Sequence, residues 1–306
     1  MNNIRKNVRD LSSTEKQNYI QAVKALKASI TRFTRRSIYD EYVLWHSLAT
    51  TRMDSSEPRG FRNAAHGGPV FLPWHRYYLY RFERQLQKIV PNVTIPYWDW
   101  AQDADDPFNS PIWADDFLGG NGDPQDNNLV KTGSFAADQW ITVNLDGSAK
   151  GGLQRQFGQR AQTLPTQTEV NIMLGEIPYD SPPWSPDSSP SHRNRLEGFL
   201  TPDGSFATAE SFTQLHNLAH TWIGGDMVNI PVSPNDPVFF LLHSNVDRLW
   251  AIWQDKNPTQ EYQPTSGGPD GHNLYDLMYP WDGKTTKLKA RPADVLDSRK
   301  LGIYYA

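Results

Sequence analysis

Apolar residues recur every three to four positions in five stretches of the chain, and this spacing predicts five amphipathic helices. The first begins with the capping-box pattern Ser12-x-x-Glu15 and is expected to extend to about Arg35. The other four are expected at roughly residues 37–49, 73–90, 211–223 and 237–255. Residues 91–210 are rich in Pro, Gly, Asp, Asn and Ser, which predicts a long irregular region with short strand-like pieces such as Trp140–Asn144.

The predicted helices lie in both halves of the chain, and neither an internal repeat nor a linker separates the halves. With 306 residues, the chain has an ordinary size for one enzyme domain with long loops. We therefore expect residues 1–306 to form a single, mainly α domain. The four helices after the first should make a four-helix bundle, wrapped by long loops and a few short strands.

Six of the eight histidines fall into two groups of three, within or beside these helices. The first group is His46, His66 and His75, and the second is His216, His220 and His243. All but His66, which is placed in a loop, are expected on inward helix faces, and His216 and His220 share one face because they are four residues apart. Six buried imidazoles without a metal would leave many ring nitrogens without hydrogen-bond partners. The two triplets therefore predict a dinuclear metal centre.

The residues around the triplets limit the kind of ion. The chain has no Cys, which excludes thiolate ligands and iron–sulfur clusters. Ligation by imidazole alone suits Cu, Zn, Fe or Ni. The stretch His216-Asn-Leu-Ala-His220 lacks the glutamate base of a His-Glu-x-x-His zinc protease, and the second triplet lacks the Glu-x-x-His pairs of a di-iron bundle. Neutral imidazoles without a carboxylate favour Cu(I), while a mononuclear zinc hydrolase on the second triplet stays open.

Composition narrows the expected partners. The formal net charge is −4 and no basic stripe is present, so we expect neither nucleic acid nor an anionic membrane as a partner. No run of 18 apolar residues is present, so no membrane span is expected. The N-terminal segment has no apolar core of a signal peptide, and we expect a cytoplasmic protein or one exported without a visible signal peptide.

Three segments near the histidines carry a longer and more specific signal. They are Phe71-Leu-Pro-Trp-His75-Arg76, Pro96-Tyr-Trp-Asp-Trp100 and Asn235-Asp-Pro-Val-Phe-Phe-Leu-Leu-His243-Ser-Asn-Val-Asp247-Arg248. With them, the chain resembles the type-3 copper proteins, and bacterial tyrosinases in particular, over nearly its whole length. The resemblance implies two copper ions per chain, ligated by the two triplets, with O2 as co-substrate. It also implies a copper monooxygenase and oxidase that ortho-hydroxylates monophenols and oxidises o-diphenols to o-quinones, with small phenols as substrates.

The same resemblance implies roles for residues beside the ligands. Glu197 and Asn217 match a Glu–Asn pair that holds a water near the second copper and helps to remove the phenol proton. Phe71 and Phe239, each four residues before a ligand, are expected to pack on ligand rings. Residues expected to line the substrate pocket are Asn63, Thr221, Met227, Val228, Ile230 and Phe239.

Asp247 lies one turn after His243, so it is expected to contact a ligand histidine or to pair with Arg248 or Arg76. The remaining two histidines, His192 and His272, lie in polar stretches and are expected to be solvated loop residues without a metal.

Leu242 is the plainest departure from the family pattern, because most tyrosinases carry a second histidine directly before the ligand that His243 matches. Copper binding should survive, but the balance among substrates is open. A catechol oxidase or an o-aminophenol oxidase with weak monophenol activity is therefore an alternative, and a hemocyanin-like oxygen carrier is an alternative from another class. A homodimer is one option for assembly, and the need for a copper-delivery partner is open.

Overall fold

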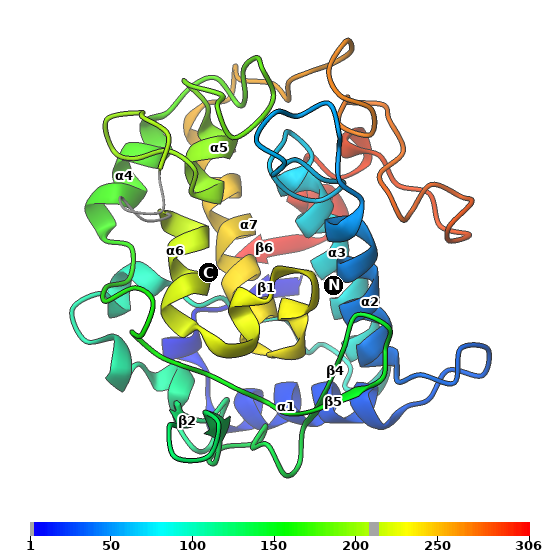
Figure 1. Cartoon of the computed structure of the whole chain (residues 1–306), viewed down its shortest axis with the longest axis vertical. Coiled ribbons are helices and arrows are strands. Elements are labelled where there is room, and N and C mark those ends of the chain that lie inside the picture. The colour runs from blue at the N-terminus through cyan, green and yellow to red at the C-terminus, as the bar shows by residue number, and fades with distance from the viewer. Residues whose placement is uncertain (1–2, 208–213) are drawn as a thin grey trace.

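The computed structural model describes residues 3–207 and 214–306. Figure 1 shows four helices side by side in the order α6, α7, α3 and α2, with α1 across one end of the group. Their bounds are α1 (Ser13–Ala28), α2 (Ile38–Thr51), α3 (Phe71–Ile89), α6 (Leu215–Ile223) and α7 (Val238–Lys256). The predicted fold class, a mainly α four-helix bundle wrapped by long loops, is confirmed.

Aromatic side chains fill the centre of the bundle. On α3, Phe82 stacks on Phe240 of α7 with ring centroids 3.7 Å apart, and Tyr78 stacks on the same ring at 5.8 Å. The hydroxyl of Tyr78 donates to the carbonyl of Tyr42 on α2 at 2.8 Å. These contacts fix α2, α3 and α7 against one another, and the apolar stripes that predicted the helices become this core.

The first helix is shorter than its pattern predicted. It begins as expected, with the Ser12–Glu15 capping box formed in both directions, but it ends at Ala28 rather than near Arg35. Its buried stripe stops at Leu26, and the next apolar position at helical spacing, Ile30, is 63% exposed. The backbone turns extended at Ser29, because no core surface remains for a further helical turn to cover.

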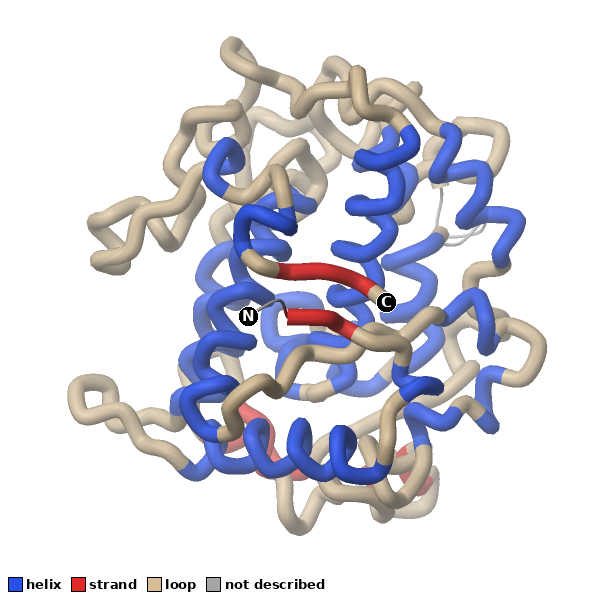
Figure 2. Tube along the Cα trace, turned by 180° about the vertical axis from the view of Figure 1, so that it is seen from behind, coloured by secondary structure: helices blue, strands red, loops and turns tan. Residues whose placement is uncertain are grey.

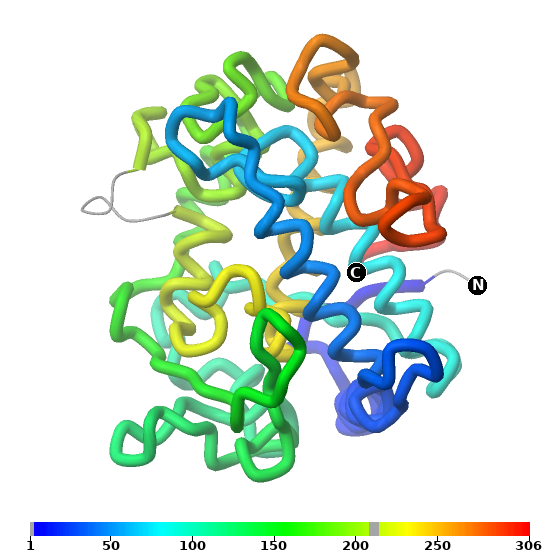
Figure 3. The backbone as a smooth tube through the Cα atoms, turned by 45° about the vertical axis from the view of Figure 1, so that its right-hand side comes forward, coloured from blue at the N-terminus to red at the C-terminus, as the bar shows by residue number. Residues whose placement is uncertain are grey.

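The predicted helix over 211–223 is present from Leu215, and its first residues, 211–213, lie outside the described part of the chain. The region predicted as irregular, 91–210, contains two helices that the pattern did not indicate, α4 (Gln167–Gly175) and α5 (His192–Glu197). Figure 3 shows this region, largely green, outside the bundle and running from one end of it to the other. The signal for α4 was present as a second capping box, Thr166-x-x-Glu169, and the structure forms it.

Strands are few and short. The first and last strands, β1 (Asn3–Arg5) and β6 (Ile303–Tyr305), pair in parallel, as Figure 2 shows from behind the bundle. Two antiparallel pairs lie in the irregular region, namely β2 (Gly122–Asp123) with β3 (Leu129–Val130), and β4 (Ile141–Val143) with β5 (Ala149–Gly152). The strand expected at Trp140–Asn144 is thus confirmed as β4.

Short 3-10 helices occupy several connections. They are η1 (Val8–Asp10), η2 (Trp100–Asp103), η3 (Pro107–Asn109), η4 (Pro111–Trp113), η5 (Gly225–Val228), η6 (Ile230–Asn235), η7 (Pro292–Asp294) and η8 (Ser298–Leu301). Of these, η5 and η6 matter for the site, because they connect α6 to α7 in the sequence and these two helices carry the second histidine triplet. Within the described residues, no helix has both the length and the apolar character to cross a bilayer.

Candidate dinuclear copper site

The two histidine triplets converge in the bundle as two groups. In each group, one possible ligand atom per residue lies within 4.8 Å of those of the other two. His46 comes from α2 and His75 from α3, while His66 lies in the loop between them. His216 and His220 come from α6, and His243 from α7. The two groups adjoin, because the rings of His75 and His243 stack with centroids 4.2 Å apart.

Backbone carbonyls orient four of the six rings through Nδ1. The pairs are His46 with the carbonyl of Pro231 at 3.1 Å, His75 with Phe71 at 2.8 Å, His216 with Glu197 at 3.1 Å and His220 with Met227 at 2.9 Å. A carbonyl only accepts, so Nδ1 carries the proton in each case and the Nε2 lone pair is left free. This is the tautomer that a metal-binding imidazole needs.

Among the described residues, no hydrogen-bond donor outside the histidine groups contacts the freed nitrogens. In the second group, Nε2 of His243 lies 3.2 Å from Nε2 of His216 and 3.3 Å from Nε2 of His220. Nδ1 carries the proton in both His216 and His220, so each short contact places an Nε2 lone pair against Nε2 of His243. Such a contact requires a cation or a proton between the two nitrogens. Metal–imidazole bonds of about 2 Å in a tetrahedral site place neighbouring nitrogens about 3.3 Å apart, so the group matches a metal ion.

In the first group, Nε2 of His46 and Nε2 of His75 are buried without a hydrogen-bond partner, as is Nδ1 of His66. Buried polar atoms of this kind are rare in folded proteins and call for an ion or a water. Two such Nε2 atoms beside a ring nitrogen of His66 therefore fit a second metal ion, and the all-nitrogen donor set fits copper.

Burial keeps all six rings neutral. It lowers the pKa of His46 to about 3 and that of His220 to about 4, in each case mainly because the charged ring would lose its hydration. The pKa values of the other four ligands are lowered well below the usual range by the same desolvation, with repulsion from neighbouring histidines added. Neutral imidazole is the metal-binding form, so the six lone pairs are available at neutral pH.

The two phenylalanines singled out by sequence lie against the ligand rings. Phe71 packs on His75 and His216, with centroids 4.8 and 5.0 Å apart, and so contacts both groups. Phe239 packs on His243 at 4.1 Å and on His46 at 5.0 Å. Both are fully buried, and they exclude water from the sides of the ligand rings.

The loop that carries His66 is held by its own residues. Oδ1 of Asn63 accepts from the backbone N–H groups of Ala65 and His66, at 3.0 and 2.9 Å. Gly67 follows with a φ of +68°, and a Cβ there would lie 2.6 Å from the carbonyl oxygen of Phe61. Only glycine fits both the left-handed backbone and the close approach.

Glu197 contacts the surroundings of both groups. Its Oε1 accepts from the backbone N–H of Gly67 at 2.7 Å, next to His66, and its main-chain carbonyl accepts from Nδ1 of His216. Its Oε2 accepts from Arg193 at 3.1 Å. Burial raises the pKa of Glu197 to about 7, although Arg193 and the Gly67 amide both act to lower it.

Asn217 lies beside the same ligand. Its Oδ1 shares the proton on Nδ1 of His216, at 2.9 Å, with the carbonyl of Glu197. A Cβ on Gly198 would lie 3.0 Å from Cβ of Asn217, so the end of α5 and Asn217 are close neighbours. The structure thus brings Glu197 and Asn217 together at the second group.

The residues expected to line the substrate pocket divide into two sets. Ile230 is 52% exposed, and Thr221 and Val228 are partly buried. Asn63, Met227 and Phe239 are buried. They also support ligands, through the His66 loop, the carbonyl bonded to His220 and ring packing respectively.

Asp247 touches arginines rather than a ligand histidine. It is buried and pairs with Arg76, as one of the expected alternatives had it, and also with Arg5 of β1 at 3.2 Å and with the hydroxyl of Tyr305. Arg248 pairs with Asp99 instead. Nδ1 of His243 therefore gains no partner from this carboxylate.

His192 and His272 are not solvated, contrary to expectation. His192 is fully buried and stacks on Trp253 at 4.1 Å, and His272 is 2% exposed and accepts from the N–H of Val70 at 3.4 Å. Their polar sequence neighbours concealed this burial, because tertiary packing rather than local composition produces it. Among the described residues, neither belongs to a cluster that could hold a metal.

Comparison with known proteins agrees with this geometry. The common central domain of tyrosinase matches residues 36–256. The chain is 41% identical to a tyrosinase of Streptomyces glaucescens over 96% of both chains, and 38% identical to the grixazone synthase of Streptomyces griseus subsp. griseus over 99% of both.

Solved structures share the fold. A polyphenol oxidase from Thermothelomyces thermophila has a TM-score of 0.71 at 22% identity, covering 99% of this chain and 88% of the other. A functional unit of octopus hemocyanin has a TM-score of 0.61 at 21% identity, covering 99% and 67%. The length and level of the sequence matches, together with two neutral, buried histidine triads, show that the chain belongs to the tyrosinase family of copper enzymes, which oxidise phenols with O2 at a pair of copper ions.

Proposed function

We propose that this enzyme carries out both tyrosinase reactions, the ortho-hydroxylation of monophenols and the oxidation of o-diphenols to o-quinones, and that Glu197 is the residue on which the first depends. The observation that carries the proposal is the position of Glu197, whose side chain contacts the His66 loop while its carbonyl contacts His216. When bound, the copper pair supplies O2 binding and the electron exchange with the substrate.

The proton of the phenol sets the difference between the two reactions. A phenol has a pKa near 10, so a monophenol at neutral pH must give its proton to a base before its ring is attacked. Glu197 is a buried carboxylate beside the second triad, and each of its oxygens has a second lone pair besides the one used for Gly67 or Arg193. It is therefore able to accept a proton through a bound water.

Asn217 completes this arrangement. Its oxygen is committed to His216, which fixes the orientation of the ligand ring, and its amide nitrogen carries two N–H donors. A water held between this amide and Glu197 would be placed to pass the phenol proton to the carboxylate. Val228 and Ile230, apolar and partly or largely exposed, offer a surface for an uncharged aromatic ring, and the neutral Thr221 adds no charge to pair with a substrate carboxylate.

The test compares the two reactions in the copper-loaded Glu197→Gln variant. Glutamine keeps the size of the side chain and an acceptor for Gly67, but it is not a base. We expect kcat/KM for a monophenol such as tyramine to fall at least ~100-fold, while kcat/KM for catechol changes by less than about threefold. Glu176→Gln, which alters a carboxylate at the end of α4 outside the site, serves as the control. Equal losses on both substrates would refute the role of Glu197.

A second candidate is o-aminophenol oxidation. It is favoured by Leu242, a fully buried apolar residue where most tyrosinases carry a histidine. The same assay with o-aminophenol decides between the candidates. Turnover of o-aminophenol well above that of both phenols would make it the main reaction.

A further inference from the structure

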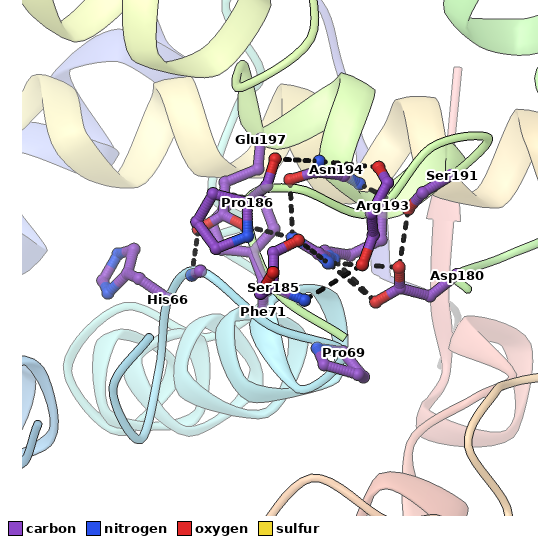
Figure 4. A network of polar contacts seen from close by, with 12 residues as sticks. His66, Pro69, Phe71, Asp180, Ser185, Pro186, Ser191, Arg193, Asn194 and Glu197 are labelled. Carbon is purple, nitrogen blue, oxygen red and sulfur yellow. Dashed lines mark hydrogen bonds and ion pairs between the residues drawn. The ribbon is translucent and has the colours of Figure 1, made fainter. Parts of the chain in front are cut away.

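A buried arginine that the sequence did not single out contacts Glu197 at the carboxylate oxygen that does not face the His66 loop. Arg193 is one helical turn before Glu197 on α5 and is fully buried. Figure 4 shows its guanidinium between the carboxylates of Asp180 and Glu197. An Arg-x-x-x-Glu pair on one helix face is the signal that would have found it, because residues four apart are neighbours.

Every N–H group of the guanidinium has a hydrogen-bond partner. It donates to Asp180 twice, from Nε at 2.9 Å and Nη2 at 3.1 Å, and from Nη1 to Glu197 at 3.1 Å. It also donates to Oδ1 of Asn194 at 2.9 Å and to the carbonyl of Ser185 at 3.1 Å. These five hydrogen bonds equal the number of N–H groups on an arginine side chain. Asp180 is itself held by the hydroxyl of Ser191 at 2.7 Å.

Arg193 therefore fixes one oxygen of Glu197 and leaves the other facing the His66 loop. In that position Oε1 accepts from Gly67, while the main-chain carbonyl of the same residue accepts from His216. One residue thus connects the loop of the first triad to the helix of the second. Without the ion pair, the carboxylate would be free to turn away from Gly67.

We propose that Arg193, clamped by Asp180, is a positioning residue: it holds Glu197 in the one orientation that joins the two histidine triads, and so sets both the copper affinity of the centre and its ability to hydroxylate monophenols. Arg193 touches no ligand histidine in the described structure and acts only through Glu197. The part concerning monophenols rests on the proposed role of Glu197, whereas the part concerning copper affinity does not.

The alternative is a purely structural role, in which Arg193 only neutralises the buried charge of Asp180. The variant Arg193→Lys separates the two, because lysine keeps the charge beside Asp180 but a single ammonium cannot make the forked contact with Asp180 and also hold Glu197. Arg195→Lys is the matched control. Arg195 lies on the same helix and pairs with Glu176 at 2.7 Å, away from Glu197.

The first measurement is made on copper-free protein, by titration with Cu(I) in competition with a chromophoric Cu(I) chelator. We expect Arg193→Lys to bind copper at least ~10-fold more weakly than the wild type, the usual scale for losing an outer contact of a metal site, and Arg195→Lys to bind as the wild type does. Unchanged affinity in Arg193→Lys, or an equal loss in both variants, would overturn the proposal.

The second measurement is the ratio of monophenol to diphenol kcat in a double-mutant cycle with Glu197→Gln. If Arg193 acts through Glu197, Arg193→Lys lowers the ratio about tenfold alone and less than twofold in the Glu197→Gln background. If the effects of the two single substitutions on this ratio multiply in the double variant, the proposal is overturned. A copper effect without any effect of Glu197→Gln on the ratio would support Arg193 as a positioning residue for the metal centre and reject the proposed base.

Folding is checked by circular dichroism and thermal unfolding of each variant. If Arg193→Lys does not fold, Asp180→Asn replaces it, because it keeps Arg193 but removes the charge that clamps it. The same weakening of Cu(I) binding is then expected, and wild-type affinity in a folded Asp180→Asn protein would overturn the proposal.

Discussion

At the scale of single residues, a ligand histidine differs from a structural one in its surroundings. Near the free ring nitrogen of a ligand lie the ring nitrogens of other histidines. His192 resembles the ligands in several respects: it is buried, its Nδ1 is bonded to the carbonyl of Met173, and its Nε2 has no partner within the described part of the chain. Its free nitrogen, however, meets no second metal-binding group among the described residues, and its ring lies flat on Trp253. One unpartnered nitrogen marks a buried imidazole, while three that converge mark a metal site.

A buried neutral histidine makes stability depend on pH. Burial lowers the pKa of His192 to about 3, against 6.5 in the unfolded chain. Between these values the unfolded chain binds a proton that the folded chain does not, so stability falls as pH drops below about 6.5, by up to about 1.4 kcal/mol per pH unit for this group. In copper-free protein, His192→Phe should reduce the slope of unfolding free energy against pH by one proton between pH 4.5 and 6.

Urea unfolding at several pH values measures this slope. Tyr179→Phe is the control, because it also removes a buried hydrogen bond to a backbone carbonyl, that of Pro69, without removing a group that titrates in this range. A slope in His192→Phe equal to that of the wild type would mean that His192 is protonated in the folded state.

At the scale of elements, short connections do as much for the site as the helices do. The helices α2, α3, α6 and α7 carry five ligands, but the loop with His66 and the 3-10 helices η5 and η6 supply the rest of the geometry. Met227 in η5 and Pro231 in η6 present the carbonyls that orient His220 and His46. His220 is thus oriented by the turn that directly follows its own helix, and His46 by a turn 185 residues away in the chain.

The His66 loop allows a direct test of this point. Gly67 and Gly60 have nearly the same positive φ, +68° and +69°, so alanine costs about 1–2 kcal/mol of strain at either. Only at Gly67 would the new Cβ meet backbone, at 2.6 Å from the carbonyl of Phe61, whereas nothing lies within 4 Å at Gly60. We expect Gly67→Ala to displace His66 and to bind about one copper per chain, while Gly60→Ala binds two.

Copper content after dialysis against excess metal, measured by atomic absorption, gives the result. Two tightly bound copper ions in Gly67→Ala would show that the loop accommodates the methyl group without moving its ligand.

At the scale of the whole molecule, the two ends of the chain are locked into the bundle by buried charge. β1 and β6 pair in parallel, and Arg5 of β1 reaches Glu83 on α3 at 3.1 Å and Asp247 on α7 at 3.2 Å. Asp247 also pairs with Arg76 and accepts from Tyr305 of β6. This cluster joins both terminal strands to the two central helices of the bundle, one helical turn after His243 on α7.

Asp247→Asn should therefore be strongly destabilising, although it touches no ligand. Removing the shared carboxylate leaves two buried arginines short of negative charge, which costs about 3–5 kcal/mol of unfolding free energy. Asp255→Asn, on the same helix, breaks a pair with Arg299 in which both side chains are 58% exposed, and should cost less than about 1 kcal/mol. Urea unfolding of the copper-free proteins measures both, and similar costs would contradict the structural role of the cluster.

Local signals in the sequence were enough to place the four helices of the bundle and to single out the six candidate ligands. The spacing of apolar residues placed α2, α3, α6 and α7, and the i, i+4 pair His216 and His220 with the neighbouring motifs indicated copper, because both depend on residues close together in the chain. The carbonyls that fix the ligand tautomers, the burial of His192 and His272, and the partners of Asp247 were decided only by tertiary structure. So was the clamp of Arg193 on Glu197 by Asp180. Each of these joins segments far apart in sequence or depends on the packing around them, and no local pattern encodes which distant backbone or charge a side chain will meet.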